Sequence, residues 1–346
     1  MANIKRKKIN LALQGGGSHG AVTWGVLDRL LEDERLEIEA ISGASAGAVN
    51  AAALAFGLHL GGPPAARQKL NELWGAISDV GAFYSPVQRT PFEVASGDFN
   101  LDDSYAYYAF DVFTRLFSPY QFNPFNINPL RDLLAKCIDF ESLKACKATR
   151  LFLSATNVKS GKVRVFETRE VSLDVVLAST CLPFLFKAVE IGGEHYWDGG
   201  YMGNPVLFPF FYEAQSNDVV IVHVNPLDRE KLPVTTSEIL NRVNEISFNS
   251  SLLRELRAIA FVHRLLDEGW LKKAFRGRLR DIRVHSIRSD RSLADLSVSS
   301  KFSVDRRFLH ALKDRGRTIA DEWLAENFGS IGKRSSVDIR AMFDGG

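Results

Sequence analysis

Gly43-Ala44-Ser45-Ala46-Gly47 joins an apolar strand expected at 38–42 to an apolar helix expected at 46–58. Glycines at both ends permit a sharp turn, and a serine at its apex then exposes its hydroxyl above the end of the strand. The N-terminus of the following helix favours negative charge that develops there. The pattern predicts that Ser45 is a nucleophile; a glycine-rich turn with a purely structural role is the alternative.

A second glycine-rich turn, Gln14-Gly15-Gly16-Gly17-Ser18-His19-Gly20, lies between a strand expected at 9–13 and a helix expected at 20–34. Consecutive glycines leave backbone N–H groups uncovered, and the helix adds its dipole, so the turn suits a phosphate or the oxyanion of an acyl-transfer intermediate. A dinucleotide site would need an acidic residue at the end of the second strand. That strand ends at Ser42 and runs into the serine turn, which favours an oxyanion hole. The expected donors are Gly15, Gly16 and Gly17, with His19 and Gly20 completing the motif.

The third motif is Trp197-Asp198-Gly199-Gly200, in which an aspartate follows a short apolar strand. Two glycines after it allow a close approach to another segment of backbone. An aspartate that caps its own turn is the common alternative for an Asp-Gly pair. The same tripeptide recurs at 344–346, in a segment that we expect to be frayed, so only Asp198 is a candidate functional residue.

Alternating strand and helix patterns indicate the fold class. Strand, helix, strand and helix follow one another from 9 to 77, which favours an α/β fold with a mostly parallel central sheet and helices on both faces. Further strands are expected at 151–158, 162–167, 219–224 and 282–287, and long helices at 236–266 and 306–328.

The chain divides into segments of different character. We expect a basic N-terminal segment at 1–8, a catalytic core at 9–226 with an irregular aromatic insert at 81–127, a C-terminal helical extension packed on the core at 227–328 and a poorly ordered tail at 329–346. A long aromatic segment without periodicity suits a lid over an apolar site. The aromatic residues of this expected lid or acyl-chain surface are Phe92, Phe99, Tyr105, Tyr107, Tyr108, Phe110, Phe113 and Phe117.

Composition limits the classes of function. The chain has 346 residues and a formal net charge of +2, so we expect no nucleic-acid partner. Three scattered cysteines, Cys137, Cys146 and Cys181, form no metal or disulfide pattern and fit a reducing compartment. We find no secretory start and no run long enough to span a bilayer. We therefore expect a cytoplasmic protein without metal or cofactor, in which any contact with a membrane would be peripheral; the sequence predicts no oligomeric state.

In this order, the three motifs resemble those of the patatin-like phospholipase family, whose members are lipid acyl hydrolases of three-layer architecture. The resemblance extends from about residue 9 to residue 226 and includes Ala178–Pro183 and Asn204-Pro205. It implies that Ser45 attacks the ester carbonyl, that Asp198 accepts its proton directly as the second member of a dyad, and that the three glycines form the oxyanion hole. It also implies that the substrates are acyl esters of phospholipids or neutral glycerolipids, cleaved without a metal.

One departure concerns His19, which stands where the family usually has arginine or lysine. The charge of a histidine varies across physiological pH, unlike that of arginine. Three alternatives remain open. They are a Ser-Asp-His α/β-hydrolase triad with His223 or His263, a non-catalytic module that binds a lipid or nucleotide, and an acyltransferase that uses the same serine. In α/β-hydrolases the nucleophile turn follows several strands, whereas Ser45 follows the second expected one, so the dyad is preferred.

Overall fold

A sheet of eight strands lies at the centre of the part of the chain that the computed structural model describes: residues 6–84, 87, 99–102, 104–229, 231–270, 272, 275 and 278–344. The strands are β1 (Lys7–Leu13), β2 (Leu36–Gly43), β3 (Arg150–Asn157), β4 (Val163–Glu167), β5 (Val189–Ile191), β6 (Glu194–Asp198), β7 (Asp218–His223) and β8 (Arg283–Arg288). Hydrogen-bonded pairs link them in the order β5-β6-β3-β2-β1-β7-β8, and β4 also pairs with β3. Because β3, β2, β1, β7 and β8 are parallel neighbours, the predicted mostly parallel α/β sheet is confirmed.

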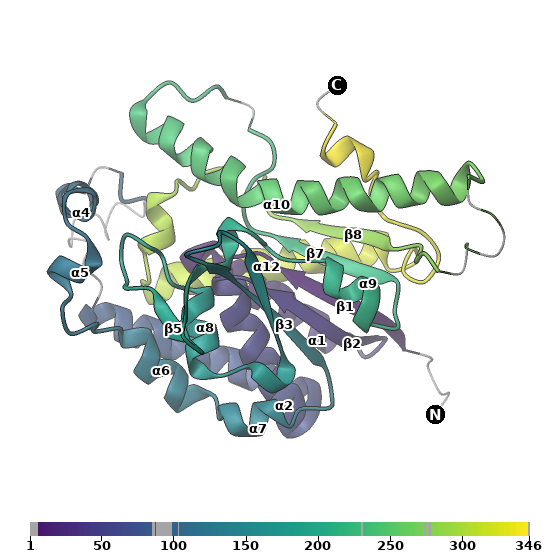
Figure 1. Ribbon diagram of the computed structural model, residues 1–346, viewed down its shortest axis with the longest axis horizontal. Coiled ribbons are helices and arrows are strands. Elements are labelled where there is room, and N and C mark those ends of the chain that lie inside the picture. Colours follow the sequence, from purple (N-terminus) through teal and green to yellow (C-terminus); the bar gives the residue numbers. More distant parts are fainter. Residues whose placement is uncertain are drawn as a thin grey trace.

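Helices cover both faces of this sheet (Figure 1). The α-helices are α1 (Gly20–Glu32), α2 (Ala46–Tyr84), α4 (Tyr105–Leu116), α5 (Pro119–Phe122), α6 (Pro129–Cys137), α7 (Phe140–Lys144), α8 (Leu173–Ser179), α9 (Phe208–Glu213), α10 (Thr236–Asp267) and α12 (Arg306–Asn327). The 3₁₀ helices are η1 (Gly17–His19), η2 (Thr168–Glu170), η3 (Gly199–Tyr201), η4 (Ser299–Phe302) and η5 (Arg340–Met342).

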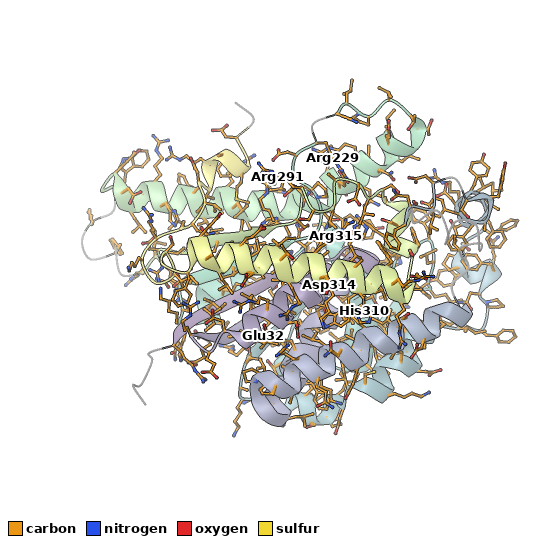
Figure 2. All side chains as sticks on the ribbon, turned by 180° about the vertical axis from the view of Figure 1, so that it is seen from behind. Glu32, Arg229, Arg291, His310, Asp314 and Arg315 are labelled. Carbon is orange, nitrogen blue, oxygen red and sulfur yellow. The ribbon has the colours of Figure 1, made fainter. Side chains whose placement is uncertain are left out.

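Alternation along the strands builds two cores, one on each face of the sheet. In β1, Leu11 and Leu13 belong to the core that contains α1, α2 and α12, and Ala12 belongs to the core that contains α9 and α10. Seen from behind, α12 crosses the sheet with Asp314 and Arg315 along it (Figure 2). A three-layer arrangement follows, because each face of the sheet is apolar and needs a cover of helices.

The helix α2 contains the helix that the sequence predicts at 46–58 and a second helix that follows it after a kink. The backbone leaves helical geometry at Gly61 and Gly62, and Pro63-Pro64 follow at once. Proline is tolerated in the first turn of a helix, so the second half restarts there in a new direction. The first half is deeply buried, as its small apolar residues predict.

The aromatic insert is more regular than expected. The helix α4 begins after Ser104, whose side chain accepts from the Tyr107 N–H at 3.5 Å, and α5 begins after Ser118 with Pro119 in its first turn. The expectation of irregular structure is wrong here, because half-buried or buried positions recur at Tyr107, Phe110 and Thr114, a helical spacing. Both helices lie at the end of the sheet opposite the N-terminus (Figure 1). The expected lid residue Phe92 lies outside the described residues.

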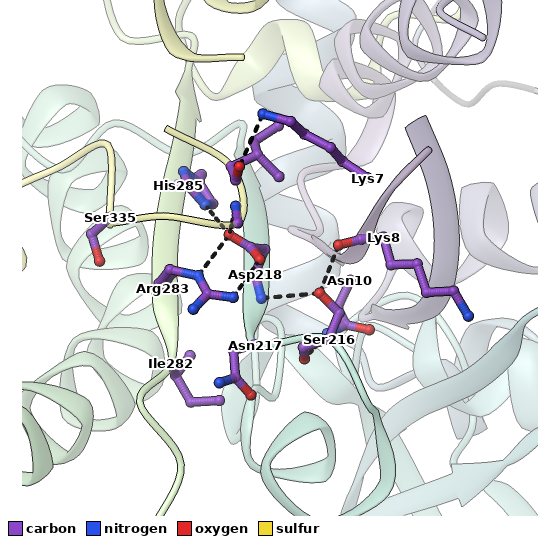
Figure 3. Close-up of polar contacts among 12 residues, drawn as sticks. Lys7, Lys8, Asn10, Ser216, Asn217, Asp218, Ile282, Arg283, His285 and Ser335 are labelled. Carbon is purple, nitrogen blue, oxygen red and sulfur yellow. Dashed lines mark hydrogen bonds and ion pairs between the residues drawn. The ribbon is translucent and has the colours of Figure 1, made fainter. Parts of the chain in front are cut away.

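The C-terminal region shares the sheet and cores of the rest of the chain. The strand β8 extends the sheet beyond β7, and α12 packs along α1. The expectation of a poorly ordered tail is wrong as far as residue 344, because Ile331 and Ile339 are buried. The Gly332 N–H donates to Asp218, which also binds Arg283 in β8 (Figure 3). Apolar burial and the hydrogen bond from Gly332 to Asp218 therefore hold the tail against the sheet.

Candidate active site

Ser45 occupies the sharp turn between β2, which ends at Gly43, and α2. Its φ of 54° lies in the left-handed region, which residues other than glycine adopt at a cost and mostly at functional sites. The Ser45 N–H donates to the carbonyl and hydroxyl oxygens of Ser179, at 3.1 and 3.0 Å, and these bonds hold the turn. At Gly47, a Cβ would lie 2.2 Å from the Leu13 carbonyl oxygen, so glycine is needed where α2 passes β1. The Ser45 side chain is half-buried and within reach of a substrate.

The register of β3 brings the aspartate motif to this turn. The strand β2 pairs with β3 up to Gly43 opposite Leu153, and β6 pairs with β3 from Asp198 opposite Ala155. The strand β4 overlaps both stretches of β3, so it occupies the other edge, and β2 and β6 follow each other along one edge. Asp198 therefore lies two positions along β3 from the end of β2. Between them, the Ser154 hydroxyl is 3.4 Å from the Gly43 carbonyl oxygen.

Asp198 is fully buried at the end of β6. Its Oδ1 accepts a 2.7 Å hydrogen bond from the N–H of Gly200, which follows Gly199 in η3. Burial raises the pKa of the carboxyl group to about 7, although the Gly200 N–H and the Ser45 side chain lower it. The other oxygen, Oδ2, has no hydrogen-bond partner among the described residues. A carboxyl group with a pKa near neutrality and a free oxygen can act as a general base.

Ser45 and Asp198 are adjacent but not aligned. The Ser45 hydroxyl is near enough to lower the pKa of Asp198, yet no hydrogen bond of ordinary geometry joins it to Oδ2. The two side chains are therefore in contact without a formed hydrogen bond. Catalytic hydrogen bonds are often loose until substrate binds.

The glycine-rich loop after β1 lies against the serine turn. A Cβ on Gly15 would be 2.5 Å from the Cβ of Ser45, so a larger residue does not fit there. The Gly15 N–H already donates to Asn204 Oδ1 at 2.7 Å. The N–H groups of Gly16 and Gly17 have no acceptor among the described residues. Of the three expected oxyanion donors, Gly16 and Gly17 are therefore the two that are free to bind a ligand.

His19 is buried immediately before Gly20, the first residue of α1. Its Nε2 shares a 2.8 Å hydrogen bond with the Ser300 hydroxyl, and its ring packs edge-on against Phe308 of α12. Burial, and then the nearby Lys301, lower the pKa of His19 well below its usual range. His19 is therefore neutral at physiological pH and does not supply the charge of the arginine or lysine that it replaces.

The other two candidate histidines have partners of their own. His223 Nε2 shares a 3.1 Å hydrogen bond with the Ser286 hydroxyl, and burial lowers its pKa to about 4. His263 Nε2 donates to the Ile282 carbonyl at 2.8 Å. Within the described part of the chain, neither forms a hydrogen bond or an ion pair with Asp198, so the geometry gives no support to a Ser-Asp-His triad.

The family model for patatin-like phospholipases matches residues 11–211. This chain belongs to the patatin-like phospholipase family. It is therefore a lipid acyl hydrolase in general terms, and its substrates are lipids or acyl esters. No curated protein matches the chain. Among solved structures it is similar to VipD from Legionella pneumophila, with 15% sequence identity and a TM-score of 0.43, over 93% of this chain and 67% of that one.

An apolar cavity of about 760 Å³ adjoins the patatin-like site. Leu116 of α4 and the neighbouring α5 form one wall, and Trp197 and Tyr201, on either side of the aspartate motif, form another. A second cavity of about 540 Å³ lies between α9 and α10 and shares Met202 as a wall residue; neither Ser45 nor Asp198 lines either cavity. The first cavity is the better candidate for binding an acyl chain, because Trp197, the residue before Asp198, lines it and does not line the second.

The expected lid residues occupy different environments. Phe117 lines the larger cavity and packs against Phe113, with ring centroids 5.1 Å apart. Tyr105 and Tyr108 are exposed to solvent. Phe99 stacks on Phe308 of α12 and therefore belongs to the core rather than to the lid.

Several polar residues that position the site were not assigned this role from the sequence. Ser179 and Asn204 stand out there only as parts of family motifs, and Ser154 and Asn225 do not stand out at all. Asn225 could have been found from the sequence, because it follows the most strand-like segment, and polar residues at the carboxyl ends of parallel strands often form binding sites.

No group of side chains that could hold a metal ion occurs among the described residues, where the three cysteines are free thiols. None of the described helices is long and apolar enough to cross a lipid bilayer.

Proposed function

We propose that this chain hydrolyses acyl esters of phospholipids or neutral glycerolipids, with Ser45 as nucleophile and Asp198 as its only base. The observation that carries the proposal is the buried Asp198 carboxyl group, which has an unpartnered Oδ2 and lies beside a serine in a strained turn. A buried acceptor without a partner is costly, and such groups are concentrated at functional sites.

The reaction begins when Asp198 takes the Oγ proton of Ser45 and Oγ attacks the ester carbonyl carbon. The carbonyl oxygen becomes an oxyanion, to which the N–H groups of Gly16 and Gly17 donate. The bond to the alcohol then breaks, and the alcohol leaves with the proton from Asp198. Water next gives a proton to Asp198 and attacks the acyl group. The bond between the acyl carbon and Ser45 Oγ then breaks, Oγ takes that proton back from Asp198, and a carboxylic acid is released.

The pKa of Asp198 supports this role. A general base works best when its pKa lies near the operating pH, and burial raises this one to about 7. At lower pH the carboxyl group is protonated and cannot accept the serine proton. Activity should therefore rise with pH through this region.

The large apolar cavity supports an acyl substrate, and the surface around it supports peripheral contact with a lipid surface. Large apolar side chains near the cavity project into solvent. They are Tyr105, Tyr108, Leu116, Tyr120, Phe125 and Phe184. Exposed apolar patches of this kind mark membrane or protein contacts, and their position beside an acyl-binding cavity favours lipid.

Labelling with a fluorophosphonate probe tests the proposal, since the probe reacts with activated serines. We expect a single adduct on Ser45, mapped by mass spectrometry, and loss of both adduct and phospholipid hydrolysis in Ser45→Ala. Labelling of a different serine, or full activity of Ser45→Ala, would contradict the proposal. Calorimetric binding of phospholipid vesicles without product over hours would favour the non-catalytic module. Transfer of the acyl group to an added alcohol in preference to water would favour the acyltransferase.

A further inference from the structure

Two side chains that follow the family-matched residues 11–211 in the sequence, Asn225 and Lys301, hold the glycine-rich loop in place. Asn225 Nδ2 donates to the Gly15 carbonyl at 2.6 Å, and Lys301 Nζ donates to Asn225 Oδ1 at 2.9 Å. The Asn225 N–H donates to Gln14 Oε1 at 3.1 Å, which fixes the asparagine relative to the loop. The Lys301 ammonium group is thus connected through one amide to the carbonyl of the residue that touches Ser45.

The backbone of Lys301 also packs on this loop. A Cβ on Gly17 would lie 2.7 Å from the Lys301 carbonyl oxygen, and Gly17 has a φ of 58°. The segment η4 therefore covers one side of the loop, and its Ser300 binds His19 on the same loop. Both contacts bring the C-terminal region to the expected oxyanion donors.

Lys301 has no carboxylate partner in an ion pair among the described residues. Glu245, the carboxylate that acts most on it, pairs instead with Arg229 and Arg242. Although the residue as a whole is half-buried, protein atoms surround its ammonium group, and this burial lowers its pKa to about 8. A cation kept from water without an ion pair is costly, and such groups occur where a negative charge develops.

We infer that Lys301 is a positioning residue for the oxyanion hole: through Asn225 it fixes the Gly15 carbonyl, and so the neighbouring Gly16 and Gly17 amides, and its positive charge stabilises the oxyanion. This inference rests on the proposed acyl hydrolase function. It assigns to the C-terminal region, outside residues 11–211 that match the family, a charge that neutral His19 does not provide.

Variants of Lys301 test the inference by steady-state hydrolysis of a soluble ester. We expect Lys301→Met to lower kcat by about 10–100-fold with little change in KM, less than the 10²–10³-fold typical of losing a direct oxyanion donor. The rate of fluorophosphonate labelling at Ser45 should fall in parallel. Lys147→Met, at an exposed lysine between α7 and β3, is the matched control and should behave like the unaltered protein.

The pH profile separates this role from a structural one. Among the described residues, the charged and titratable groups that act on Lys301 are Glu245 on α10, Arg229 after β7 and His19 in η1. Arg242 pairs with Glu245, and Arg315 on α12 acts on His19 (Arg229 and Arg315 are labelled in Figure 2). Because the ammonium group loses its proton as the pH rises through about 8, kcat should decline above that pH. Lys301→Arg stays charged and should abolish this decline while it retains most of the activity at pH 7.

The outcomes distinguish this inference from the proposed function. If the unaltered protein is neither labelled at Ser45 nor active on esters, the proposed function fails. If it is active, a folded Lys301→Met with kcat within twofold of the parent overturns only the role of Lys301. The same conclusion follows if Lys301→Arg keeps the decline above pH 8, a result that stays decisive even where Lys301→Met does not fold.

Discussion

Gly15 and Ser45 approach each other so closely that a Cβ on Gly15 would lie 2.5 Å from the Cβ of Ser45. The two residues belong to loops that follow β1 and β2, which are parallel neighbours and so end at the same edge of the sheet. An oxyanion formed on Ser45 would therefore develop beside the glycine amides. The contact is the physical link between the proposed nucleophile and its expected donors.

Gly15→Ala should abolish most activity without unfolding the protein. The added methyl group would meet Ser45 Cβ at 2.5 Å and the Ala44 carbonyl oxygen at 2.8 Å, so the loop must move away from the nucleophile. We expect kcat to fall by about 10²-fold or more, as for loss of an oxyanion donor. Gly75→Ala is the control, because a Cβ there meets nothing within 4 Å and alanine favours helix α2. Equal activity of Gly15→Ala and the parent would show that the close contact is not needed for catalysis.

Asp198→Asn should lower kcat by about 10²–10⁴-fold, the range for loss of a general base. Steady-state kinetics on a soluble ester, with far-ultraviolet circular dichroism as a check of folding, would measure this. The parent should lose activity as the pH falls through about 7, because the carboxyl group becomes protonated. An activity that stays constant from pH 8 to pH 5 would contradict the assignment of Asp198 as the base.

Asp198→Asn should also stabilise the folded protein at alkaline pH. The carboxyl group has a pKa of about 7 when folded against an ordinary value of 3.8, so the folded state holds the proton more tightly than the unfolded state. The contribution of this carboxyl group to the free energy of unfolding is therefore most favourable below about pH 4, and it falls as the pH rises from about 4 to about 7. Melting temperatures should show the variant more stable by at least about 2 °C at pH 8, with the difference shrinking toward pH 4. No difference at pH 8 would mean that burial does not disfavour the charged form.

His223→Asn and His263→Asn should each retain kcat within about threefold of the parent. His223 binds Ser286 and His263 binds the Ile282 carbonyl, so neither residue is engaged with the aspartate that a triad would require. Removing the histidine of a true triad would cost on the order of 10³-fold or more. A loss of that size in either variant, with the fold intact, would replace the dyad with a triad.

Leu116→Ser should reduce hydrolysis of vesicle substrates more than hydrolysis of a monomeric ester. Leu116 is 71% exposed and lines the mouth of the larger cavity, where it can enter a lipid surface. Burial of one large apolar side chain contributes about 1.5–3 kcal/mol, so vesicle binding should weaken about 10-fold or more. Leu60→Ser, at a 53% exposed position beside the break in α2, is the matched control. Equal losses on both substrates would place Leu116 in acyl-chain binding alone.

The sequence by itself predicts the three turns that carry the chemistry of this protein. The sharp turn at Ser45, the uncovered amides after β1 and the Asp-Gly-Gly turn each depend on neighbouring residues, chiefly on glycines that permit tight backbone. The parallel sheet follows from the alternation of strand and helix patterns, because short connections leave few topologies. The sequence does not predict the helix α4, because the half-buried face of this helix is partly aromatic and partly polar, and this mixture hides the helical spacing.

The three motifs come together through pairing between strands that are far apart in the sequence, and no local sequence pattern predicts that pairing. Asp198 reaches Ser45 because β6 continues along the edge of β3 where β2 ends, a matter of register between strands far apart in sequence. Burial in that setting, rather than residue type, raises the pKa of Asp198 to about 7, and burial equally makes His19 neutral. Only the tertiary structure identifies Lys301 as a residue that supports the glycine-rich loop, through its hydrogen bond to Asn225. The strength of an electrostatic interaction depends on distance in space, so the position of Lys301 in the sequence does not predict it.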